Sequence, residues 1–164
     1  LVDFSNVQLF NVNGNLPGPT ETDTLTFAGT NAIDRFRINL AAAGTADDPV
    51  LKLQTATNNT LLTLQNYSNF DTLRAAGLDS SDTFNVYTSP TGVSRNVFID
   101  GGLPSGKKKS TDNLNVYYVN PRPRIIHSAA TQDPDAGMVD LDYGVGRFLV
   151  QYDDIEQVTI KRCN

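Results

Sequence analysis

The chain contains few of the residues on which catalysis, cofactor binding and covalent stapling usually depend. Its 164 residues include no tryptophan, one methionine, one histidine (His127) and one cysteine (Cys163). One cysteine cannot form a disulfide within the chain, whereas small secreted domains normally use several. A chain of this length can bury a sizeable core without such bonds. We therefore interpret Cys163 as an incidental thiol or as an intermolecular link.

Basic residues and long apolar runs are also scarce. Thirteen Lys and Arg face eighteen Asp and Glu, so the formal net charge is −5. Nucleic acids are not expected as partners, because binding to phosphates needs basic patches. No apolar run has the length of a membrane span, and no signal peptide is visible. Because residue 1 is Leu, we expect a mature or excised segment of something longer.

The remaining sequence has the pattern of short β-strands. No window shows convincing helical periodicity, while many short runs alternate apolar and polar residues between turn-forming residues. The chain therefore predicts a single all-β domain over residues 1–164. Eight apolar side chains are predicted to face the core, because each lies on the apolar phase of such a run: Phe36, Leu53, Leu64, Phe70, Phe84, Phe98, Leu114 and Val150.

Two patterns recur along the chain. One is an aspartate followed by apolar residues two and four positions later, beginning at Asp23, Asp34, Asp82 and Asp112. We predict that these aspartates accept backbone N–H bonds in the turn before each strand. The other is an aromatic pattern near residues 4–12, 67–73 and 152–160. Recurrence of this kind is typical of a repeat protein.

The recurring segments resemble a known class of repeat. Segment 77–86 ends in Asp82-Thr-Phe-Asn-Val, and Val97-Phe-Ile-Asp-Gly-Gly102 is followed by Asp112-Asn-Leu-Asn-Val116. These segments resemble the Asp/Gly-rich tandem β-repeats of very large secreted bacterial surface proteins, and distantly the calcium β-roll repeat. The resemblance implies a β-solenoid, or parallel β-helix-like, module that is extracellular and structural or adhesive. The chain departs from the β-roll because nine residues separate Gly102 from Asp112.

Two readings of fold and two of function remain open. For the fold, the alternative to a β-solenoid is a β-sandwich of immunoglobulin type. For function, the first reading is a non-enzymatic structural module of a cell-surface protein or filament. The alternative is a carbohydrate-binding or polysaccharide-degrading β-helix domain, which predicts a row of outward-facing aromatic side chains.

Candidate sites are few. Calcium needs several converging oxygen ligands, and Asp79, Asp82 and Asp100 are the best candidates because they begin or end neighbouring strands. No other cofactor is expected. His127 lacks a suitably placed nucleophile, since the adjacent Ser128 points to the opposite face of a strand. The segment Lys107–Lys109 is expected to be a solvated loop or a contact for an acidic neighbour.

The expected partners are copies of the chain or neighbouring repeats. The aromatic pattern occurs near both ends of the chain, so we expect an unpaired strand edge at each terminus. Joined head to tail, such edges build a filament or a ring. Cys163 lies just beyond the last copy of the pattern, where it could link two modules.

Overall fold

The computed structural model describes residues 10–13, 23–40, 51–68, 70–91, 96–102 and 111–163. These residues form strands and no helix, which confirms the predicted all-β class. Within these ranges, accordingly, no helix is long and apolar enough to cross a membrane. The strands are β1 (Phe10–Asn13), β2 (Thr24–Ala28), β3 (Asp34–Asn39), β4 (Leu51–Thr55), β5 (Thr60–Ser68), β6 (Thr72–Ala76), β7 (Thr83–Thr88), β8 (Asn96–Asp100), β9 (Asn113–Tyr118), β10 (Arg124–Ala129), β11 (Gly137–Asp142), β12 (Arg147–Asp153) and β13 (Gln157–Arg162).

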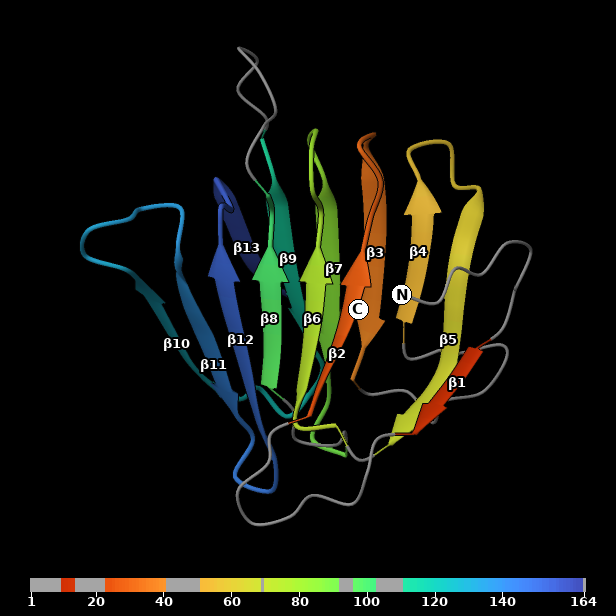
Figure 1. Ribbon diagram of the computed structural model, residues 1–164. Helices are drawn as coiled ribbons and strands as arrows, with labels where there is room; N and C mark the ends of the chain where they lie inside the picture. Colours follow the sequence, from red (N-terminus) through yellow and green to blue (C-terminus); the bar gives the residue numbers. More distant parts are fainter. Residues whose placement is uncertain are drawn as a thin grey trace.

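The strands form two mixed sheets that pack face to face (Figure 1). The seven-stranded sheet has the order β1-β5-β4-β3-β7-β9-β13, and the six-stranded sheet has the order β10-β11-β12-β8-β6-β2. Four times, the chain passes from a strand of the six-stranded sheet to the next strand in sequence, which lies in the seven-stranded sheet. We call each of these pairs a rung: β2–β3, β6–β7, β8–β9 and β12–β13.

Strands of successive rungs pair in parallel in both sheets. In the six-stranded sheet β2, β6, β8 and β12 are parallel neighbours, and in the seven-stranded sheet β3, β7, β9 and β13 are. The first two rungs keep one register in both sheets, because Leu25 pairs with Leu73 and Phe36 with Phe84. Equivalent apolar positions therefore stack on each other.

Antiparallel strands extend each sheet at one end only. The hairpin β4–β5 pairs with β3 and extends the seven-stranded sheet, and β1 adds to it in parallel. The hairpin β10–β11 pairs with β12 and extends the six-stranded sheet. The turn between β4 and β5 contains Asn58 at a φ of 64°, a conformation that asparagine tolerates better than most residues.

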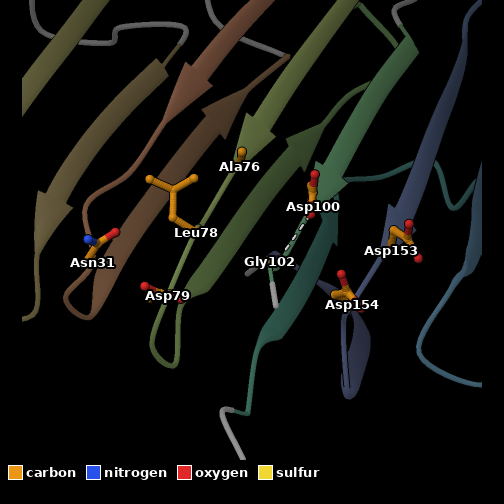
Figure 2. Close-up of a pocket in the computed structure, with 8 residues that line it drawn as sticks. All are labelled: Asn31, Ala76, Leu78, Asp79, Asp100, Gly102, Asp153 and Asp154. Carbon is orange, nitrogen blue, oxygen red and sulfur yellow. Dashed lines mark hydrogen bonds between the residues drawn. The ribbon is translucent and has the colours of Figure 1, made fainter. Parts of the chain in front are cut away.

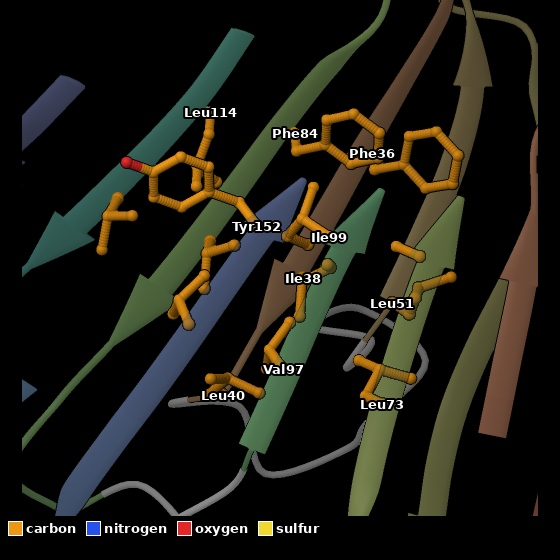
Figure 3. Close-up of a cluster of buried hydrophobic side chains, with 14 of the residues drawn as sticks. Phe36, Ile38, Leu40, Leu51, Leu73, Phe84, Val97, Ile99, Leu114 and Tyr152 are labelled. Carbon is orange, nitrogen blue, oxygen red and sulfur yellow. The ribbon is translucent and has the colours of Figure 1, made fainter. Parts of the chain in front are cut away.

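The core fills the space between the sheets (Figure 3). Alternation places Phe36 and Ile38 of β3 inward, together with Phe84 and Val86 of β7, and all four are fully buried. Of the eight predicted core residues, Phe36, Leu53, Leu64, Phe84, Leu114 and Val150 are confirmed as buried, and Phe70 is partly buried against the core.

The prediction for Phe98 is wrong. Val97 and Ile99 are the buried residues of β8, so Phe98 lies on the outer face, where the guanidinium carbon of Arg74 is 5.1 Å from its ring centroid. In a run of three apolar residues, alternation does not tell whether the outer two or the middle one faces inward. The two β-branched side chains, Val97 and Ile99, face the core here.

The recurring patterns map onto the rungs unequally. The aspartates 34, 82 and 112 stand at the starts of β3, β7 and β9, which are equivalent strands, whereas Asp23 precedes β2 in the other sheet. The aromatic pattern at 152–160 spans the passage from β12 to β13, and that at 67–73 spans the passage from β5 to β6. Of the pattern near 4–12, residues 4–9 lie outside the described residues.

Candidate functional site

A column of carboxylates runs across the rungs at the start of the seven-stranded sheet's parallel strands. The backbone N–H of Asp34 donates to Oδ1 of Asp82 at 2.7 Å, and that of Asp82 donates to Oδ1 of Asp112 at 2.6 Å. The N–H of Asp112 donates to Oε2 of Glu156 at 2.5 Å. We call these four residues the carboxylate ladder. It joins all four rungs by the same bond.

The predicted role of these aspartates is confirmed in part. Asp82 and Asp112 accept backbone N–H bonds, but from the preceding rung rather than from their own turn. Asp34 also accepts within its own turn, from the N–H and hydroxyl of Thr30. In the other sheet Asp23 donates its N–H to the exposed carboxylate of Asp71. The aspartates therefore hold successive rungs together more than they shape single turns.

The fourth member of the carboxylate ladder, Glu156, was not among the residues predicted from the sequence. Glu156-Gln-Val158-Thr-Ile160 repeats the aspartate pattern with a glutamate in the first position and supplies the fourth carboxylate. A search for either acidic residue, followed by apolar residues two and four positions later, would have found it.

Glycines make room for the buried carboxylates. A Cβ placed on Gly29 would lie 2.7 Å from Oδ2 of Asp34, and one on Gly77 would clash with the Asp82 carboxylate and the carbonyl of Gly101. Each glycine ends a strand of one sheet just before the acidic residue that opens the next. The spacing of glycine and aspartate along the chain is thus a packing requirement.

Burial raises the pKa of Asp82 to about 7. The N–H bond from Asp34 opposes this shift, and the neighbouring carboxylates of Asp112 and Asp34 add to it. Asp34, Asp82 and Asp112 are all 0% exposed, and Oδ2 of Asp82 has no hydrogen-bond partner among the described atoms. A carboxyl group with this pKa is largely neutral below pH 7, whereas an ordinary aspartate is charged there.

An acidic pocket opens beside the ladder, where strands of the six-stranded sheet end (Figure 2). It has a volume of about 490 Å³, and Asp79, Asp100, Asp153 and Asp154 are among its lining residues. Burial raises the pKa of Asp154, and the nearby carboxylates of Asp153 and Asp100 raise it further. Asp100 forms an ion pair with Arg74 and accepts the N–H of Gly102 at 3.2 Å.

The three predicted calcium ligands are placed in two different environments. Asp79 and Asp100 line the acidic pocket, whereas Asp82 belongs to the buried ladder and not to the pocket lining. In the part of the chain that the structure describes, no three His, Cys, Asp or Glu side chains are arranged to hold a metal ion. Lys107–Lys109 lie outside the described residues.

A row of aromatic and cationic side chains crosses the outer face of the seven-stranded sheet. The rings of Tyr87 and Tyr117 stack with centroids 4.6 Å apart and an angle of 6° between planes. Arg37 lies 5.2 Å from the centroid of Tyr87, and the Lys161 ammonium lies 4.9 Å from that of Tyr117. The row therefore links β3, β7, β9 and β13 on the outside, as the ladder links them on the inside.

The histidine and the cysteine each form a hydrogen bond with a tyrosine. Nε2 of His127 is 2.8 Å from the hydroxyl of Tyr152, a tyrosine whose pKa is raised by burial. The adjacent Ser128 also belongs to β10, in which neighbouring side chains point to opposite faces. Cys163 is a half-buried free thiol, and its N–H donates to the carbonyl of Tyr118.

Comparisons with protein-family models, with curated proteins and with solved structures found no match.

Proposed function

We propose that the chain is a structural repeat module whose rungs stack as a β-solenoid. The observation that carries this proposal is the matched parallel order of the rungs in both sheets, with the carboxylate ladder joining each rung to the next. Stacked rungs of this kind bury a continuous core that no single rung could bury alone. An immunoglobulin-type sandwich is built from antiparallel strands and does not account for this order.

The module joins others head to tail through its terminal strands. Support comes from the position of β1 and β13 at opposite edges of the same sheet. The two strands also run in the same direction. β5 is antiparallel to β4, which is antiparallel to β3, so β5 runs in the direction of β3, and β1 is parallel to β5. At the other end β3, β7, β9 and β13 are all parallel. The last strand of one copy and the first of the next can therefore pair in parallel, and such a contact propagates.

The setting we propose is an extracellular bacterial surface protein or filament, in which the module has a structural or adhesive role. This setting depends on the resemblance of the Asp/Gly-rich segments to repeats of large secreted surface proteins. The carboxylate ladder on the inner side and the row of aromatic and cationic side chains on the outer face both join one rung to the next. Contacts of this kind are those of a structural module. The neighbouring partners are copies of the chain or adjacent repeats.

The alternative of a carbohydrate-binding or polysaccharide-degrading β-helix predicts an outward row of aromatics, and Tyr87 and Tyr117 form one. Sugars bind such rows by stacking on ring faces, however, and the faces here are occupied. Tyr87 lies between Arg37 and Tyr117, and Tyr117 lies between Tyr87 and Lys161. The row therefore favours the structural reading.

Light scattering across a range of concentrations tests the proposed assembly. We expect the mass of the intact chain to rise with concentration, and removal of residues 1–13, which include β1, to abolish the rise. In β13, Ile160→Lys should have the same effect, because Ile160 lies on the inner, half-buried phase of the edge strand. Thr159→Lys is the matched control, since Thr159 is exposed on the outer face.

Circular dichroism of each variant establishes that it is folded before its mass is compared. A chain that stays monomeric at every concentration contradicts the proposed head-to-tail assembly. Equal effects of Ile160→Lys and Thr159→Lys contradict the strand pairing at β13.

A further inference from the structure

The junction between neighbouring rungs in the seven-stranded sheet repeats one pair of hydrogen bonds. The acidic residue of the earlier rung donates its N–H to the carboxylate of the later one, as Asp82 does to Asp112. In return, the residue after the later acid donates its N–H to the earlier acid's carbonyl, as Asn113 does to Asp82 at 2.9 Å. Both backbone groups of the earlier acid thus point toward the next rung.

The same pair of bonds recurs at the last junction. Asp112 donates its N–H to Oε2 of Glu156, and Gln157 donates its N–H to the carbonyl of Asp112 at 3.1 Å. The strands stay in register throughout, because Thr83 pairs with Asn113 and Asn113 pairs with Gln157. The geometry is therefore a property of the repeat and not of one junction.

Glu156 ends the ladder. By repetition of this geometry its N–H and carbonyl point away from β9, beyond the free edge of β13, which pairs on that side with no other described strand. The inner side chains of β13, Val158 and Ile160, are only half buried, whereas their partners Leu114 and Val116 on β9 are fully buried. The last rung therefore has backbone groups directed at an edge that no described strand occupies and apolar side chains that are only half covered.

We propose that the free edge of β13 is a binding site for a further rung whose parallel strand opens with Asp or Glu opposite Glu156. The incoming carboxylate accepts the N–H of Glu156, and the next residue of the incoming strand donates its N–H to the Glu156 carbonyl. Apolar residues two and four positions after the acid cover Val158 and Ile160. This inference rests on the proposed function and names the chemistry of an adjacent repeat rather than of a second copy, because β1 (Phe10–Asn13) contains no acidic residue.

The test appends a rung to the intact chain. A copy of residues 79–88, which contains β7 without β6 because β11 already occupies the side of β12 on which β6 would pair, is joined after Asn164 through a flexible linker and serves as the appended rung. Amide hydrogen exchange is followed at Glu156. The appended copy of Asp82 supplies the carboxylate. Because a hydrogen bond to a charged group stabilises by about 1.5–3 kcal/mol, we expect exchange at Glu156 to slow by about tenfold or more.

Two variants of the appended rung distinguish the effect of its carboxylate on exchange from the effect of adding a strand. With Asp82→Ala in the appended copy alone, the added protection at Glu156 should be lost. With Asp82→Asn there, it should largely remain, because the amide keeps an oxygen acceptor. Unchanged exchange with the appended rung, or equal protection from the Asp and Ala versions, would overturn the inference.

The outcome is distinguishable from that of the proposed assembly of copies. A chain that does not self-associate in light scattering, yet gains protection at Glu156 from the appended rung, contradicts only the assembly of separate copies. A chain that self-associates but shows the same exchange at Glu156 with the Asp and the Ala version of the appended rung contradicts only the inference about β13.

Discussion

Asp82→Asn should change how the stability of the protein depends on pH. Asp82 is buried between two other carboxylates, and burial raises its pKa from 3.8 to about 7. Because the folded state holds this proton to higher pH than the unfolded chain does, the contribution to stability is complete below about pH 4 and is lost as the pH rises toward 7. Asparagine keeps an oxygen that can accept the Asp34 N–H and removes the charge.

The size of the effect follows from the shift. Three pKa units correspond to about 4 kcal/mol, and relaxation of the site with partial access of water reduces this to about 2–4 kcal/mol. For a chain of this length that is a fall in Tm of about 5–15 °C between pH 4 and pH 8, seen in the wild type and largely absent in Asp82→Asn. The measurement is thermal unfolding by circular dichroism at constant ionic strength.

Asp71→Asn is the matched control for this prediction. Asp71 accepts the N–H of Asp23 across the same separation of 48 residues that joins Asp34 to Asp82, but its carboxylate is exposed. This variant removes one negative charge from the acidic chain and should keep the wild-type pH dependence. A wild-type Tm that is constant or rises between pH 4 and pH 8 would refute the reasoning, as would equal profiles for the wild type and Asp82→Asn.

Other predictions address the core, the glycines, the outer face and calcium. Phe84→Ala should cost about 3–5 kcal/mol in urea unfolding, because the ring is 0% exposed and stacks on Phe36, while Phe98→Ala on the outer face should cost about 1 kcal/mol; equal costs would contradict the register of β8. Gly77→Ala should destabilise by more than about 2 kcal/mol through its clash with Asp82, whereas Gly144→Ala, which meets no atom within 4 Å, should cost only the roughly 1 kcal/mol of its positive φ. Arg147→Met should lower Tm at neutral pH, and its effect should shrink as the pH falls below 3.8: the hydrogen bonds from Arg147 hold the pKa of Asp140 below its usual value, so the stabilisation is complete above that usual value and is lost in stronger acid. Micromolar calcium should leave Tm unchanged, since Asp82 already accepts a backbone bond; a strong rise reversed by chelator would support the predicted calcium site.

Local patterns were sufficient to predict the strands and most of the core. Alternation with period two placed Phe36, Phe84 and Leu114 inward, because a side chain two positions along a strand returns to the same face. The same rule failed at Phe98, because three successive apolar residues left the phase undetermined and Val97 and Ile99 face the core instead. The turn-forming residues Asn58 and Asn59 lie between β4 and β5, where the chain reverses direction.

The candidate sites were harder to predict, because they depend on which strands become neighbours. The separation between Asp34 and Asp82 is 48 residues, and that between Asp82 and Asp112 is 30. Unequal rung lengths hide the repeat from a search at a fixed period. Asp79 and Asp82 are close in sequence, yet one lines a pocket and the other is buried, since the intervening turn directs them to different sides of the chain.

The antiparallel hairpins bear on how far the stack can extend. The hairpin β4–β5 occupies the side of β3 on which a preceding rung would pair, and β10–β11 occupies the side of β12 on which a following rung would pair. Each sheet is therefore extended beyond the four rungs at one end and stops at a rung strand, β2 or β13, at the other (Figure 1). Because the two extensions lie at opposite ends of the stack, each end presents one projecting sheet and one recessed edge. A neighbour that matches this step continues both sheets at once, whereas a neighbour with a flat end can pair with only one. A step of this kind favours an adjoining module with the complementary offset, which a second copy of this chain in the same orientation provides at its other end.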